Sequence, residues 1–310
     1  MRKFSEMKIG EEVSFNALVE SMQKRFTPNK KAYYSLGLTD GESIIDARVW
    51  DEALVEKNEV KAGYVYAFEA HINEYAGKMQ YVVKVIKPVD EDVDVTKFFR
   101  TAPLSGEYLK AGIKEFIQRI DNEILKKVVV ELIANVKDDY FNYPAAMSMH
   151  HNYQYGLIHH TYSMLKLAEA CLDLYPNLNK NLLYAGVLIH DVGKTKELSG
   201  VHSPVYTQEG NLLGHIVIGL QMLAVVADKL GYQDTEEVKM LEHMIASHHG
   251  ELEWGSPKEP GILEAYALHY IDLIDSKLAA INPEVGKGQK GQNTGPIGSI
   301  NRKALYIPKI

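Results

Sequence analysis

Histidine and acidic residues are concentrated in one part of this chain. Of its 12 histidines, only His71 precedes residue 150, and the other eleven lie between His150 and His269. Residues 1–88 hold 13 basic and 13 acidic residues, whereas the rest of the chain holds 21 and 28, so the formal net charge of −7 belongs to the later region. Imidazole and carboxylate groups gathered in one region indicate a metal site.

The pair His190-Asp191 stands at the end of an apolar segment. Residues 182–189 are Leu-Leu-Tyr-Ala-Gly-Val-Leu-Ile, and Val192-Gly193-Lys194 follow the pair. A helix that is apolar nearly all round is buried, so its terminal histidine and aspartate would be held rigidly in the interior. Rigid placement of ligands is what a metal site requires.

Four other predicted helices also present ligand groups on apolar faces or at apolar ends, namely His160, His215, the pair His248-His249, and Asp272. A single histidine on an apolar face is usually a hydrogen-bonded core residue, but the recurrence on separate helices favours metal binding. An unpaired carboxylate such as Asp272 would destabilise an apolar helix. The set exceeds what one ion needs, so two ions that share Asp191 are the economical arrangement. Imidazole and carboxylate without thiolate suit Mn, Fe, Co, Ni or Zn.

The elements before this region are predicted to be strands. Val13, Phe15 and Ala17 alternate with polar or small residues, and further strands are expected at 34–38, 44–50, 64–70 and 81–86. Helical character is confined to about residues 52–59, between the third and fourth strands. This is the element order of an OB-fold barrel, although strand counting alone also allows an SH3-like barrel.

After an acidic and proline-interrupted segment, the apolar period becomes helical. Helices are expected at 108–119, 123–137, 156–174, 180–189, 214–229, 235–247 and 260–280. We therefore predict a multi-domain α and β protein, in which an all-β OB-fold barrel precedes an all-α helical bundle. The predicted divisions are the barrel at 1–88, a linker at 89–105, the helical domain at 106–282, and a glycine-rich segment with the C-terminal tail at 283–310.

The order of the ligand-type residues resembles a known superfamily. His160, His190-Asp191 and Asp272 are similar to the H…HD…D motif of the HD-domain phosphohydrolases. His215, His248 and His249 look like the additional ligands of the binuclear members of that superfamily.

The resemblance extends to nearly the whole chain. An OB-like domain before the HD motif, together with Pro144-Ala145-Ala146, His150-His151 and the run 190–194, resembles the YhaM-type 3′-to-5′ exoribonucleases of Gram-positive bacteria. Tyr155 departs from that pattern, because a second glycine is expected before Leu157.

The resemblance implies which residues hold each ion. One ion would be held by His160, His190, Asp191 and Asp272, and a second by Asp191, His215, His248 and His249. The expected cofactor is a divalent transition metal with two ions per chain. Mn is expected first, and Co, Fe, Ni or Zn are the alternatives. A water between the ions would attack phosphorus. Asp191, as the ligand shared by both ions, is therefore expected to be a catalytic residue.

Three further residues near the motif are candidates for substrate contact. Lys194, one turn beyond the HD pair, is expected to bind a phosphate oxygen, the alternative being a lysine that satisfies helix carbonyls. His150 and His151 would contact phosphate or ribose, or else lie in a loop without such a role. Asp275, one turn after Asp272, either supports the site or is a solvated carboxylate.

The barrel carries the residue types that bind single-stranded nucleic acid, which are basic and aromatic side chains together. The candidates are Lys24, Arg25, Phe26, Tyr33, Tyr34, Trp50 and Tyr75. Stacking tolerates any base, which suits an exonuclease. The alternative is that Trp50 and some of the tyrosines belong to the barrel core.

Together with these features, the resemblance implies a metal-dependent 3′-to-5′ exoribonuclease that hydrolyses single-stranded RNA to nucleoside 5′-monophosphates, with single-stranded DNA as a secondary substrate. Two alternatives remain open. One is an HD-domain phosphodiesterase or phosphohydrolase that acts on a free or cyclic nucleotide. The other is a non-catalytic RNA-binding adaptor on an HD scaffold.

The composition of the 310 residues, 46% hydrophobic and 24% charged, excludes a disordered or fibrous chain. No apolar run is expected to reach the ~18–20 residues of a membrane span, and the N-terminus becomes acidic too early for a signal peptide. The single cysteine, Cys171, is compatible with a reducing cytoplasm, where we expect the protein. Homo-oligomers formed through the barrel or the tail are compatible with the sequence.

Overall fold

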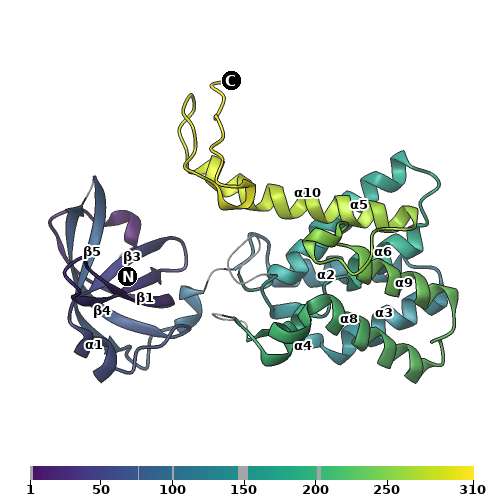
Figure 1. Ribbon diagram of the computed structural model, residues 1–310, viewed down its shortest axis with the longest axis horizontal. Helices are drawn as coiled ribbons and strands as arrows, with labels where there is room; N and C mark the ends of the chain where they lie inside the picture. Colours follow the sequence, from purple (N-terminus) through teal and green to yellow (C-terminus); the bar gives the residue numbers. More distant parts are fainter. Residues whose placement is uncertain (1–2, 76, 100, 146–152, 201–203) are drawn as a thin grey trace. The chain divides into compact units, whose positions relative to one another are not determined.

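The computed structural model describes residues 3–75, 77–99, 101–145, 153–200 and 204–310 (Figure 1). The chain forms two compact units, Met1–Thr101 and Ala102–Ile310. The division falls within the segment 89–105 that the sequence predicts to be a linker, which contains a short 3₁₀ helix, Val95–Phe98.

The first unit is a closed barrel of five strands with the order β1-β2-β3-β5-β4. The strands are β1 (Glu12–Phe26), β2 (Ala32–Thr39), β3 (Ile44–Val49), β4 (Val65–Tyr75) and β5 (Lys78–Pro88), and α1 (Glu52–Lys57) lies between β3 and β4. This order confirms the OB-like fold rather than the SH3-like alternative. A one-turn 3₁₀ helix, Phe4–Glu6, precedes the barrel.

The barrel closes because β1 is long enough to pair along both of its edges. Its first half pairs with β4 and its second half with β2, and the register shifts between Val19 and Ser21. Alternate residues point inward, so Phe15 stacks on Phe68 with 5.7 Å between ring centroids. The parallel pairing of β3 with β5 completes the barrel.

The second unit is predominantly helical, as the change of period predicts. Its helices are α2 (Gly106–Gln118), α3 (Glu123–Asn135), α4 (Lys137–Asn142), α5 (Gly156–Leu174), α6 (Lys180–Ile189), α7 (Lys194–Glu197), α8 (Gln208–Leu230), α9 (Glu236–Ser247) and α10 (Leu263–Gly286). The remaining elements are the paired strands β6 (Leu198–Ser199) and β7 (Val205–Tyr206), and two 3₁₀ helices, Leu252–Trp254 and Gly298–Ile300. Side-chain oxygens of Ser105, Asn122, Asn179, Thr207 and Thr235 cap helix N-termini.

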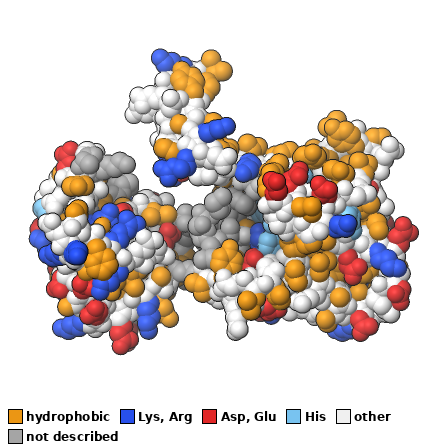
Figure 2. Space-filling view, in the orientation of Figure 1, with side chains coloured by type: hydrophobic (Ala, Val, Ile, Leu, Met, Phe, Trp, Pro, Cys, Tyr) orange, Lys and Arg blue, Asp and Glu red, His pale blue; other side chains and the backbone are white. Residues whose placement is uncertain are grey.

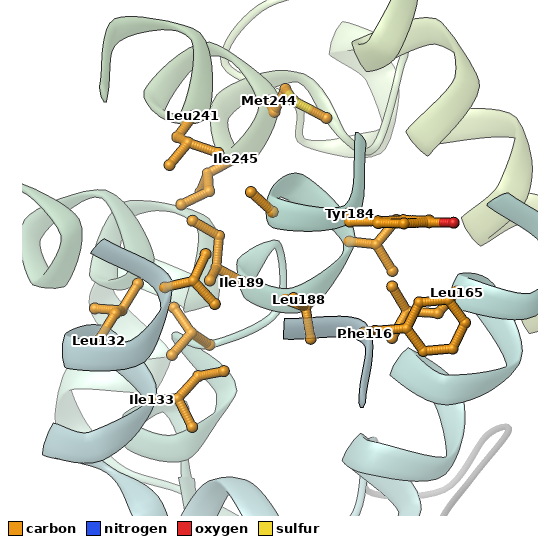
Figure 3. Packing of buried hydrophobic residues seen from close by; sticks show 14 of the residues in the cluster. Phe116, Leu132, Ile133, Leu165, Tyr184, Leu188, Ile189, Leu241, Met244 and Ile245 are labelled. Carbon is orange, nitrogen blue, oxygen red and sulfur yellow. The ribbon is translucent and has the colours of Figure 1, made fainter. Parts of the chain in front are cut away.

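Helix α6 runs through the core of this unit. Every residue from Leu182 to Ile189 is buried, and the neighbouring helices contribute Phe116, Leu132, Leu165 and Leu241 around it (Figure 3). The hydroxyl of Tyr140 donates to the Leu188 carbonyl at 2.7 Å, close to the end of the helix. The turn after Ile189 is therefore held in the interior.

Helix α5 begins at a residue with an uncommon backbone conformation. Tyr155 has φ 66° and ψ 12°, the left-handed region in which glycine carries no penalty and other residues lose about 1–2 kcal/mol. This is the position at which the family pattern leads us to expect a glycine. The tyrosine ring lies 5.7 Å from Lys110 Nζ, a contact that glycine cannot make.

Two helices extend beyond their predicted limits. Helix α8 starts at Gln208 rather than Gly214, and its backbone is non-helical at Gly214. Helix α10 continues through Pro283 to Gly286, into the segment predicted to be glycine-rich and irregular.

Helix α8 also corrects one expectation from the sequence. It is the one described helix that meets the length and hydropathy criteria for a membrane span, although the sequence led us to expect no such segment. Its residues Ile218, Leu223 and Val226 are buried in the helical core. Within the window that meets the criteria 39% is buried, so the match to a membrane span rests on length and composition.

Candidate functional site

The predicted metal ligands converge at one place in the helical unit. His160 comes from α5, His190 and Asp191 from the end of α6, His215 from α8, His248 and His249 from the end of α9, and Asp272 from α10. They form two groups, His160 with His190 and Asp272, and His215 with His248 and His249. Within each group, one ligand atom per residue lies within 4.8 Å of the others.

Asp191 lies between the two groups and offers one oxygen to each. Its Oδ2 is 3.3 Å from His190 Nε2 and 3.8 Å from His160 Nε2. Its Oδ1 is 3.5 Å from His215 Nε2 and 3.8 Å from His248 Nε2. The carboxylate is buried, with 5% of its side chain exposed, so this arrangement is not a chance surface contact.

Backbone carbonyls fix the orientation of three imidazoles. The Nδ1 of His190 hydrogen-bonds the Val187 carbonyl at 2.9 Å, that of His248 the Ile245 carbonyl at 2.8 Å, and that of His249 the Trp254 carbonyl at 2.9 Å. Since a carbonyl only accepts, each Nδ1 carries a proton. Nε2 is therefore the nitrogen through which each of these rings would bind a metal.

The residues fit divalent metal ions. The Nε2 atoms of His190 and His215 are buried and have no hydrogen-bond partner within the described chain. Burying a polar atom without a partner is unfavourable, whereas coordination of a cation would satisfy both nitrogens. The donor set of imidazole and carboxylate suits transition metals.

Two carboxylates hydrogen-bond the Nδ1 atoms of ligand histidines, on the side of the ring away from Asp191. Glu197 Oε1 is 3.1 Å from His215 Nδ1, and Asp275 Oδ2 is 2.7 Å from His160 Nδ1. Such a bond raises the basicity of a metal-binding imidazole and holds its ring in place. The sequence interpretation left the role of Asp275 open and missed Glu197. The only local signal for Glu197 is its place one turn beyond Lys194.

Two glycines allow α7 and α8 to approach the HD turn. A Cβ on Gly193 would lie 2.0 Å from the His215 carbonyl oxygen, so any side chain there would displace α8. Gly214 has φ 71°, which turns the chain immediately before His215. The backbone N–H of His215 then donates to Glu197 at 3.0 Å.

The charges of the site favour a cation. Burial alone would raise the pKa of Asp191, but Lys194 and His190 hold that pKa well below its usual range. Burial would lower the pKa of His160, but Asp272 and Asp275 raise it to about 9. By contrast, burial and the neighbouring His190 lower the pKa of His248 well below its ordinary value. The carboxylates are therefore ionised, and positive charge is stabilised between them.

Lys194 is directed at Asp191 rather than at a helix carbonyl. Its Nζ lies 2.7 Å from Asp191 Oδ2, and its side chain is 15% exposed. The ammonium group has three donors, and one of them makes this contact. Contact of the others with a phosphate oxygen stays a prediction.

The barrel brings only part of the predicted basic and aromatic set together. Tyr33 on β2 and Trp50 after β3 stack with 4.8 Å between ring centroids, as expected from the antiparallel pairing of Tyr34 with Val49. Arg48 lies over the Tyr33 ring at 5.5 Å and Lys31 over the Trp50 ring at 5.9 Å. Arg48 was missed from the sequence, although it shares a strand face with Trp50. We call these four residues the β2–β3 cluster.

The other predicted barrel residues do not belong to this cluster. Arg25 pairs across the strands with Tyr33, whereas Lys24 forms an ion pair with Glu52 of α1 and lies 5.7 Å from the Tyr34 ring centroid. Tyr34 packs against the barrel core, while Phe26 and Tyr75 are exposed at strand ends. Figure 2 shows basic side chains beside hydrophobic ones on this unit. His150 and His151 lie outside the described residues.

Comparison with known proteins agrees with this geometry. The HD domain family model matches residues 157–277, which include every residue of the two ligand groups. The chain is 37% identical to the 3′-5′ exoribonuclease YhaM of Bacillus velezensis over 97% of this chain and 96% of that protein. It is 38% identical to the 3′-5′ exoribonuclease YhaM of a Geobacillus species over 97% of this chain and 93% of that protein.

A solved structure is also similar to part of the chain. The second OB-fold domain of replication protein A from Methanococcus maripaludis is 19% identical, with a TM-score of 0.24. The match covers 30% of this chain and 98% of that domain.

Proposed function

The chain belongs to the YhaM family of 3′-5′ exoribonucleases, and from this membership we propose that it shortens single-stranded RNA from the 3′ end in a metal-dependent reaction. The single observation that supports this most directly is Asp191, whose two oxygens face two separate groups of ligands. A phosphohydrolase of free nucleotides and a non-catalytic adaptor are not favoured, because the two relatives described above, which match 97% of this chain, are exoribonucleases by name. A cytoplasmic location remains a proposal.

We propose that the site holds two divalent ions. Mn is the preferred metal, and Co, Fe, Ni or Zn are the alternatives. His160, His190, Asp191 and Asp272 would hold one, and Asp191, His215, His248 and His249 the other. When bound there, divalent ions supply activation of a water for attack on phosphorus and neutralisation of charge on the phosphoryl oxygens.

The chain's own residues prepare this chemistry. Asp191 holds the two groups in a common geometry, and Glu197 and Asp275 fix the ring planes of His215 and His160. Lys194 stands with its ammonium at the same carboxylate, where it would place a positive charge beside a non-bridging phosphate oxygen. The released product would be a nucleoside 5′-monophosphate.

We propose that the barrel holds the strand being shortened. The β2–β3 face is where OB folds bind oligonucleotides, and the β2–β3 cluster supplies stacking surfaces with adjacent positive charge. Single-stranded DNA offers the same phosphates and bases, so it is proposed as a secondary substrate. Assembly into homo-oligomers is compatible with this function.

The test is a time course on 5′-labelled single-stranded RNA with Mn²⁺, resolved on a sequencing gel. A ladder that shortens from the 3′ end, abolished by a chelator and by Asp191→Ala, is expected. Asp228→Ala removes an exposed carboxylate on α8 and should leave the ladder unchanged. RNA that stays intact with the wild-type chain, or a ladder that persists in Asp191→Ala, would refute the proposal.

A further inference from the structure

An exposed tryptophan stands at the edge of the metal centre. The pocket that contains Asp191, Lys194 and Asp272 is also lined by Trp254, Leu273, Ser276 and Lys277. The side chain of Trp254 is 53% exposed, although indole is among the largest hydrophobic groups. The fold therefore presents an aromatic surface in the same pocket as the reactive groups.

Hydrogen bonds tie the backbone of Trp254 to the second ligand group. The carbonyl of Trp254 accepts from His249 Nδ1 at 2.9 Å, and its backbone N–H donates to the Glu251 carbonyl at 3.0 Å. Beneath it, His269 lies with its ring centroid 6.0 Å from that of Trp254, and His269 Nδ1 donates to the His248 carbonyl at 3.0 Å. These contacts hold the backbone of Trp254 beside His248 and His249.

Another part of the pocket lining comes from one face of α10. Asp272, Leu273, Ser276 and Lys277 follow one another at helical steps on that face. Lys277 Nζ donates to the Ser299 carbonyl at 2.9 Å and brings a positive charge to the pocket. The pocket therefore contains the charged groups beside which a phosphate would lie, the ring of Trp254, and a second lysine, Lys277.

These features match the chemistry of a nucleotide at the end of a polynucleotide. We infer that Trp254 stacks on the base of the 3′-terminal nucleotide and so positions its phosphodiester at Asp191; this rests on the proposed exoribonuclease function. Stacking uses the π-face that every base has, so the contact accepts all four bases.

The contact is tested by removing the indole, the terminal base, or both, and comparing the losses. RNA oligonucleotides with a normal or an abasic 3′-terminal nucleotide are compared on wild-type, Trp254→Ala and Trp254→Phe chains. Loss of stacking should raise KM for the normal substrate by roughly 5- to 150-fold in Trp254→Ala, with partial recovery in Trp254→Phe. On the abasic substrate the variants should equal the wild type. An equal loss on both substrates would show that Trp254 acts only on the structure of the site and would overturn the inference.

A binding measurement separates this inference from the exoribonuclease function. The chain has two tryptophans, so in the Trp50→Phe chain Trp254 is the only fluorophore of its kind. With Mn²⁺ present and excitation beyond the adenine band, 5′-AMP should quench the emission saturably. Ribose 5-phosphate should displace 5′-AMP and restore the emission. Quenching by ribose 5-phosphate, or binding of 5′-AMP without quenching, would overturn the inference even if RNA were degraded. Quenching by 5′-AMP without RNA degradation would instead refute the exoribonuclease function alone.

Discussion

One oxygen of Glu197 accepts two hydrogen bonds from His215, one from its backbone N–H at 3.0 Å and one from its ring Nδ1 at 3.1 Å. Both residues are largely buried, with 11% and 14% of their side chains exposed. The same carboxylate thus fixes where the helix resumes after Gly214 and which way the imidazole faces. Glu197 should therefore control the second ligand group without binding the metal.

Replacing Glu197 with Ala should weaken metal binding by about 10- to 100-fold at the group that contains His215, because the imidazole loses its orientation and basicity. Glu197→Gln keeps an acceptor oxygen and should recover part of the affinity. Equilibrium dialysis with Mn²⁺ measures the effect, and Glu209→Ala, an exposed change on α8, is the control. Equal Mn²⁺ affinity in wild type and Glu197→Ala would contradict the assigned role.

The two ligand groups should respond differently to single carboxylate changes. Asp272→Asn removes a donor from one group and should lower the stoichiometry of bound metal by one ion, whereas Asp191→Asn affects both groups and should abolish tight binding. Metal analysis of the purified chains, together with circular dichroism to confirm retained helices, measures this. A single ion bound equally by both variants would argue against the shared carboxylate.

The β2–β3 cluster should contribute to RNA affinity through stacking. Tyr33→Ala and Trp50→Ala should each weaken binding of single-stranded RNA by about 1–3 kcal/mol. Fluorescence anisotropy with a chelator present, to prevent hydrolysis, gives the dissociation constants. Tyr64→Ala removes an equally large exposed ring outside the cluster and should have little effect. Comparable losses in all three variants would mean that the cluster is not a specific surface.

The charge of the cluster gives an independent prediction. Lys31→Ala and Arg48→Ala should each reduce the slope of log affinity against log salt by about 0.7, the value for one single-strand phosphate contact. Binding titrations at several salt concentrations measure the slope. An unchanged slope in both variants would show that neither cation contacts phosphate.

Stability of the barrel should depend on pH through Asp40. Burial would raise the pKa of this carboxyl, but backbone N–H groups of Ser43, Phe4 and Glu42 donate to it and keep its pKa below the ordinary value. A depressed pKa in the folded state stabilises the fold above the unfolded pKa of about 3.9, and this stabilisation is lost as pH falls through the folded pKa.

Asp40→Asn should therefore lower the free energy of unfolding at neutral pH by about 1.5–3 kcal/mol, the worth of a hydrogen bond to a charged group. It should also flatten the decline of stability in acid. Urea unfolding of the full Trp254→Phe chain, followed by Trp50 emission, reports on the barrel. Glu42→Gln is the control, since its side chain is exposed. An unchanged acid profile in Asp40→Asn would contradict the assignment.

Periodicity was sufficient to predict most of the helices and the ligands they carry. His160 and Asp272 lie on helices whose apolar stripes point to the core, so the inward direction of these side chains followed from the same pattern. The five strands of the barrel, with a helix between the third and the fourth, followed from alternation and turn residues. In these cases local sequence and burial agree.

Glu197 and Tyr155 show where such reasoning ends. Glu197 meets His215 only because Gly193 and Gly214 let two segments, 18 residues apart, approach closely. A pairing of that kind has no periodic signal. Tyr155 adopts a glycine-like backbone, and its ring lies beside Lys110, a contact made by a distant part of the chain. Arg48 was missed because a short strand gives no indication of which ring its side chain will cover.

The order of the ligands along the chain has a consequence for synthesis. The ribosome makes the barrel first, and its five strands are complete at Pro88. The metal centre needs Asp272, so it cannot be assembled until that residue has left the ribosome. A growing chain thus completes its barrel well before it completes the set of ligand residues, so it cannot act as a nuclease while only the barrel has been made.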